Sequence, residues 1–157
     1  MKSNTRVLLV QENAADRDAI AEALTQRGYD IVCKESVLDA MAFLEDNPAE
    51  VDVVITALHL EHSTAFDILR AMKLRPDLKR VPFIFCCLRP SQFTIMTAES
   101  TNIAARVMGA EDLIIQDTLD ADFIDERIRL AMAPNRVEKE NLLQVGLPSA
   151  SRPPTQP

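Results

Sequence analysis

Residues 51–57 read VDVVITA, a short run of β-branched and aliphatic residues with little polar alternation. A strand of this composition is buried on both faces, which is typical of a parallel sheet that helices cover on each side. Four more runs of this kind occur, at Arg6–Val10, Ile31–Lys34, Phe83–Leu88 and Leu113–Ile115. The sequence therefore predicts a parallel sheet of five strands.

Longer stretches with helical spacing of apolar residues separate these strands. The first is the clearest, because Asn13 suits the N-cap of a helix over Ala14–Arg27 and Gly28 suits its end. Further helices are expected over 38–46, 63–74, part of 98–108, and 121–132. Right-handed crossovers would then place the first and last helices on one face of the sheet and the other three on the opposite face.

Composition limits the class of protein. With 157 residues and 47% hydrophobic content, the chain is expected to form one domain over residues 1–133. Residues 134–157 are rich in proline and small polar residues, so we expect a disordered tail. A weak helix over 135–147 and a partner-docking role are the alternatives for that tail.

Charge and hydropathy exclude other classes. A formal net charge of -7 would repel a phosphate backbone, so no nucleic-acid partner is expected. No apolar stretch is long enough for a membrane span and no signal peptide is recognisable, which predicts a cytoplasmic protein without membrane contact. Three cysteines, with Cys86 and Cys87 adjacent, form neither a disulfide framework nor a spaced metal site.

Four signatures in order resemble the receiver domain of two-component response regulators over about residues 6–132. They are Asn13, Arg17, Ile20, Leu24 and Gly28–Tyr29 in the first helix, DVVI at 52–55, VPFI at 81–84, and GAED at 109–112. The resemblance implies a flavodoxin-like (βα)5 fold, in which helices cover both faces of a five-stranded parallel sheet.

The same resemblance implies a phosphorylation site at the carboxyl ends of the strands, but the residues there depart from the family. The acidic pair that holds Mg²⁺ falls on Gln11 and Glu12, and the phospho-acceptor aspartate falls on Ala57. The hydroxyl position falls on Cys87 and the lysine position on Gln116. A methyl group is neither a nucleophile nor a metal ligand, so we expect no catalysis, no metal and no cofactor, and a protein that is not an enzyme.

The leading hypothesis is a pseudo-receiver, a stand-alone atypical response regulator in bacterial signal transduction that binds proteins independently of phosphorylation. Its partner would be a histidine kinase, another regulator or a scaffold, because no output domain fits after Ala133. The family's usual contact surface, helix four, strand five and helix five, would carry the contact or a homodimer. The candidate partner-binding residues are Phe93, Ile95, Met96, Leu113 and Asp117. The first three must be buried against the core or a partner.

The competing hypothesis is a chemically switched regulator, through thiol redox at Cys87 or an unusual phosphorylation. Against it, small cysteines commonly fill buried strands, and alternation would send Cys86 and Cys87 to opposite faces. His59 and His62 are interpreted as loop surface rather than metal ligands. The acidic run from Asp117 to Glu126 is interpreted as helix capping, with a charged docking face as the second interpretation.

Overall fold

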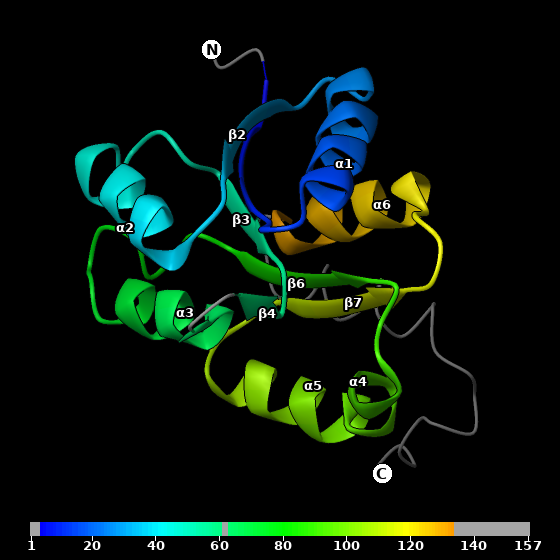
Figure 1. The fold of residues 1–157 in the computed structure, drawn as a ribbon. Helices are drawn as coiled ribbons and strands as arrows, with labels where there is room; N and C mark the ends of the chain where they lie inside the picture. Colours follow the sequence, from blue (N-terminus) through cyan, green and yellow to red (C-terminus); the bar gives the residue numbers. More distant parts are fainter. Residues whose placement is uncertain (1–3, 61–62, 134–157) are drawn as a thin grey trace, which may run out of the picture.

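The computed structural model describes residues 4–60 and 63–133. A five-stranded parallel sheet forms its centre in the order β2-β1-β3-β6-β7 (Figure 1). Its strands are β1 (Arg6–Val10), β2 (Asp30–Lys34), β3 (Val53–Thr56), β6 (Phe83–Leu88) and β7 (Asp112–Gln116). The predicted flavodoxin-like architecture is confirmed, and the predicted strand positions agree with it to within two residues at each end.

Helices cover both faces of the sheet in the predicted division (Figure 1). On one face lie α1 (Ala14–Gln26) and α6 (Ala121–Ala131), whose buried Ile20, Leu24, Ile124 and Ile128 pack on alternate strand residues. On the other lie α2 (Val37–Asp46), α3 (Ala65–Lys73) and α5 (Ala98–Val107). Since successive strand side chains point to opposite faces, each central strand contributes to both hydrophobic cores.

Side-chain caps define where several helices begin. The Asn13 side chain accepts a hydrogen bond from the Asp16 backbone N–H at 2.9 Å, as its position before α1 predicts. Ser36 caps α2 through the Asp39 N–H. These contacts satisfy backbone donors that have no partner inside the helix.

Three short elements were not predicted. Residues His59–Leu60 form β4, which pairs antiparallel with β5 (Ser63–Thr64). The predicted helix over 63–74 was therefore wrong at its start, because Ser63 and Thr64 are extended and α3 begins at Ala65. A single turn of helix, α4 (Gln92–Met96), precedes α5, and its Ser91 cap bonds the Thr94 N–H at 3.1 Å.

Some sequence predictions lie outside the described residues. These concern residues 134–157 and His62. Within 4–60 and 63–133, no helix has the length and apolar content that crossing a membrane requires.

Two glycines adopt backbone conformations that side chains disfavour, and they give a test of the fold. Gly28 and Gly109 have φ angles of 93° and 106°. We expect Gly28→Ala to lower the free energy of unfolding by about 1–2 kcal/mol. Gly109→Ala should have a similar backbone cost. Its Cβ would lie 2.6 Å from Cε of Lys73, but this flexible side chain can move aside at the expense of its hydrogen bond to the Lys79 carbonyl. Urea unfolding measures both, and wild-type stability of either variant would contradict the assigned backbone.

Candidate functional site

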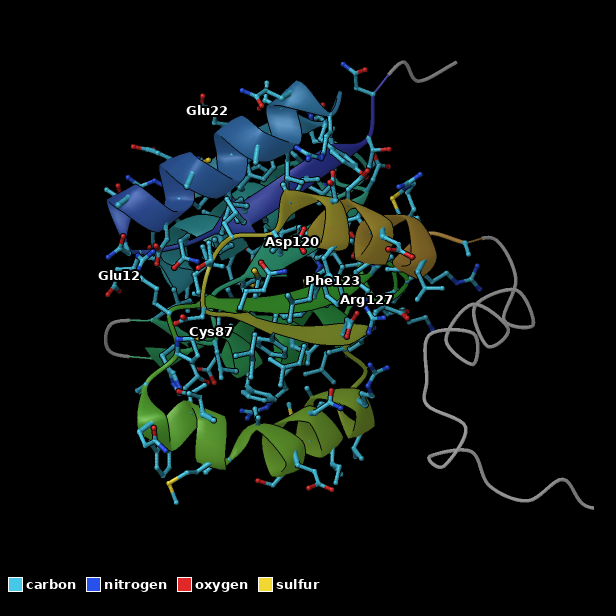
Figure 2. The ribbon with its side chains drawn as sticks, turned by 90° about the vertical axis from the view of Figure 1, so that its right-hand side faces the viewer. Glu12, Glu22, Cys87, Asp120, Phe123 and Arg127 are labelled. Carbon is cyan, nitrogen blue, oxygen red and sulfur yellow. The ribbon has the colours of Figure 1, made fainter. Side chains whose placement is uncertain are left out.

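The five positions of the family's phosphorylation site lie at one edge of the sheet. Gln11 and Glu12 follow β1, Ala57 follows β3, and Cys87 and Gln116 lie at the ends of β6 and β7. Because β1, β3, β6 and β7 are neighbouring parallel strands, their carboxyl ends are adjacent. Figure 2 shows Glu12 and Cys87 at this end of the molecule. The structure therefore brings together the residues that the sequence singled out.

The side chains at this edge do not form the donor set that Mg²⁺ prefers. The buried Ala57, 7% exposed, presents a methyl group, and Glu12 is the only carboxylate among the five positions. Gln11 is buried, and its backbone carbonyl accepts a hydrogen bond from the Arg17 guanidinium at 3.1 Å. Mg²⁺ requires several hard oxygen ligands, so these residues do not fit it. In the part of the chain that the structure describes, no three His, Cys, Asp or Glu side chains converge as a potential metal site.

An ion pair that the sequence analysis missed crosses this edge. The Arg89 guanidinium, just after β6, contacts the carboxylate of Asp16 in the first turn of α1. The Asp16 side chain is only 11% exposed, and Arg89 has a positive φ of 50°. Its backbone N–H also donates to the Gln116 carbonyl at 2.8 Å. Since 73 positions separate Asp16 from Arg89, no local sequence signal could have found the pair.

Gln116, at the family's lysine position, holds the loop that follows β7. Its side-chain oxygen accepts from the Asp120 N–H at 2.9 Å, and its amide donates to the Asp120 carbonyl at 3.3 Å. The Asp120 carboxylate in turn accepts from the Phe123 N–H and caps α6. The Gln116 side chain is thus engaged in local structure, and as an amide it supplies no charge to the edge.

The two cysteines at β6 point to opposite faces, as predicted. Cys86 is buried in the core beneath α1 and α6, and Cys87 packs partly against the other core. Burial, and then the neighbouring Cys87 and Asp16, raise the pKa of the Cys86 thiol to about 12. Burial is also the largest cause that raises the pKa of Cys87, followed by Asp16. Both thiols are therefore held in the protonated, less nucleophilic form.

The acidic run before and within α6 serves mainly local structure. Asp120 is the cap, Asp122 pairs with the Arg27 guanidinium at 2.5 Å, and Asp125 accepts from the Tyr29 hydroxyl at 2.5 Å. These contacts confirm the capping interpretation for Asp120 and add a link between α6 and α1. Asp117 is exposed.

The candidate partner-binding residues differ in their burial. Phe93, Ile95 and Met96 are 69%, 52% and 75% exposed. Of the two alternatives, burial against the core is therefore excluded, and burial against a partner stays a prediction. In α4 it is Thr94 that turns inward, since the Ser91 cap holds this single turn in that orientation. Leu113 is half-buried against the core, and His59 is exposed.

The Asp16–Arg89 pair yields a prediction for stability. Arg89→Gln leaves a mostly buried carboxylate without its cation, and we expect the free energy of unfolding to fall by about 1–2 kcal/mol. Arg75→Gln is the matched control, because Arg75 pairs with Asp77 at 2.8 Å within a surface loop and should matter little. Urea unfolding measures the stability of both variants. Equal losses of unfolding free energy would show that the Asp16–Arg89 pair stabilises the fold no more than an exposed pair does.

Known proteins with similar sequences are two-component response regulators. No family model matches the chain. The two-component response regulator ORR13 of Oryza sativa subsp. japonica is 29% identical over 125 residues, which cover 76% of this chain and 93% of that protein. ORR12 of the same organism is 27% identical and covers 73% of this chain and 88% of its own length.

Solved structures agree in fold. The chemotaxis response regulator CheY4 of Vibrio cholerae has a TM-score of 0.67 at 16% identity, covering 82% of this chain and 98% of its own. A receiver domain protein from Clostridium thermocellum has a TM-score of 0.70 at 19% identity, covering 88% and 98%. The chain is thus similar in sequence to two-component response regulators, and its fold is the one that these solved receiver structures share.

Proposed function

We propose that this chain is a receiver-type module of two-component signalling that binds another protein without taking up a phosphoryl group. Its similarity to response regulators supports the signalling role. The observation that carries the proposal is Ala57, whose methyl group lies at the carboxyl end of β3 where the family has its acceptor aspartate.

Three side chains that could be considered as substitute nucleophiles, on or next to β3 or near Ala57, are poorly suited to the role. The Thr56 hydroxyl is buried and donates to the Ala57 carbonyl at 2.9 Å, so it is engaged in backbone contacts. Burial raises the pKa of the Cys87 thiol, which lowers its thiolate fraction. Asp52 precedes β3 at the opposite end of the strand, where its carboxylate accepts from the Arg6 N–H at 2.8 Å. Phosphoryl transfer also requires cations around the transferring group, and the lysine position is an amide.

A module that takes up no phosphoryl group would regulate its partner simply by binding it. The partner would be a histidine kinase, a regulator or a scaffold protein, as in the signalling systems to which the relatives belong. Exposed Phe93, Ile95 and Met96 on α4 provide apolar anchors at one side of the face that α5 and β7 form. A few apolar side chains that become buried supply most of the energy of many interfaces. In this proposal the module is not an enzyme and uses no cofactor.

Exposure to a small phosphodonor tests the proposal directly. We expect the intact mass of the purified protein to stay unchanged in acetyl phosphate with Mg²⁺, because no carboxylate occupies the acceptor position. The positive control is the variant in which Gln11→Asp, Ala57→Asp and Gln116→Lys restore the family's residues. A phosphoryl adduct on the wild-type chain would overturn the proposal.

The competing hypothesis, a thiol switch at Cys87, makes the opposite prediction for reactivity. Because the thiolate is the nucleophile and the pKa of Cys87 is raised, alkylation by iodoacetamide at neutral pH should be slower in the folded protein than in urea, and should accelerate as pH rises. Mass spectrometry of a Cys33→Ser, Cys86→Ser variant isolates this thiol. Faster alkylation in the folded state would favour the switch.

A further inference from the structure

Strand β7 is an edge of the sheet, and a groove runs beside it. In the described part of the chain, β7 pairs with β6 alone. The groove lies between α5 and the start of α6, and its lining includes Ala98, Glu99, Asn102, Leu113, Ile115 and Phe123. Figure 2 shows Phe123 between α6 and the sheet. The outer edge of β7 is thus bordered by helices but not covered by a further strand.

The sequence of β7 carries few of the features that protect an edge strand. An edge presents backbone N–H and C=O groups to any extended chain, and proteins commonly block it with proline, lysine or a bulge. The strand reads DLIIQ, without proline or lysine, and Leu113 and Ile115 are only half-buried. At the amino end of the strand the Leu113 N–H already donates to the Asp112 carboxylate at 2.9 Å. The backbone that a further strand could pair with therefore lies toward Ile115, beside the apolar side chains that line the groove.

A charged cluster lies at the amino end of β7, next to the groove residue Phe123. The nearly buried Asp112 at the start of β7 accepts from Arg106 of α5 at 3.2 Å and from Nη2 of Arg127 of α6 at 3.1 Å. The Arg127 guanidinium also lies 5.3 Å from the centre of the Phe123 ring. These contacts join α5, β7 and α6, and Asp112 compensates part of the charge of the two arginines.

The groove has acidic residues at and beside the carboxyl end of β7. Glu99 lines it, and Asp117 and Asp120 follow the carboxyl end of β7, all three with exposed side chains. Gln116, the last residue of the strand, adds no positive charge. An incoming chain therefore meets apolar side chains along the strand and negative charge at its end, which favours Lys or Arg at that end of the ligand.

We propose that the edge of β7 accepts an extended, basic segment of a partner protein by β-strand addition. Backbone hydrogen bonds to β7 supply affinity, alternate apolar side chains fill the groove beside Leu113 and Phe123, and a Lys or Arg contacts Glu99 or Asp117. This inference rests on the proposed binding function, and it specifies how the partner is held and what its chemistry is.

Titration of the isotope-labelled full chain with synthetic peptides provides the test. The probe is a peptide of alternating valine and threonine with two lysines at each end, which avoids any assumption about strand direction. We expect amide shift changes at Leu113–Gln116 and along the groove, with binding that weakens as salt rises. The same peptide with glutamates at its ends should bind much more weakly. Equal binding of both peptides, or no change at β7 at saturating probe, would overturn the proposal.

Variants separate charge from strand pairing. Glu99→Gln and Asp117→Asn should each weaken binding of the lysine peptide by roughly twofold to fivefold, as for an exposed ion pair. Glu22→Gln makes the same charge change on the outer face of α1, away from the groove, and should have no effect (Figure 2). Ile115→Lys should abolish binding while the remaining amide spectrum confirms the fold. Unchanged binding in Ile115→Lys would exclude the groove.

The outcomes distinguish this inference from the proposed function. If the peptide shifts no β7 amide signal and the wild-type chain stays unphosphorylated, only the proposal of strand addition is overturned. A phosphoryl adduct on the wild type would overturn the proposed function and leave the peptide result standing by itself. Sedimentation that shows a dimer with β7 amides protected would identify a second copy of the chain as the occupant, and would overturn the proposal of a basic partner.

Discussion

Burial of the central strands on both faces is the constraint on which the rest of the structure depends. Leu8, Leu9, Val54 and Ile55 have no exposed surface, so β1 and β3 must be covered by helices above and below. Parallel neighbours such as Val7 with Val53, and Ile55 with Ile84, can be joined only through crossovers. The connections are therefore divided between the two faces, and the carboxyl ends of four neighbouring strands meet at one edge.

That edge has the geometry of a receiver site but different electrostatics. A receiver concentrates carboxylates there and balances them with a metal ion and a lysine. In this chain Ala57 occupies the position of the acceptor, and the buried carboxylate that does lie nearby, Asp16, is paired with Arg89 of the same chain. Because the Arg89 guanidinium balances the charge of the Asp16 carboxylate, no bound metal ion is needed for that purpose. The same pair connects the loop after β6 to the first turn of α1.

A second carboxylate organises the opposite side of the molecule. Asp112 gathers arginines from α5 and α6 at the start of β7, so the face that these elements form is held together by hydrogen-bonded charges as well as by packing. The exposed apolar side chains of α4 lie on an element outside this cluster. Because α4 is a single turn, its side chains have little adjoining surface of the same chain to pack on, so Phe93 and Met96 are not buried against the core.

Sequence alone determined the strand and helix order, because apolar runs and helical spacing reflect local burial, and it determined the chemistry at Ala57 and Gln116, because a residue type sets what its side chain can do. It could not find β4, β5 or α4, whose few residues have no period of their own. Only the tertiary structure decided that Asp16 meets Arg89, that Asp112 meets two arginines, and that β7 has an uncovered edge. Those contacts join positions far apart in the chain, and their energy exists only after the sheet has brought them together.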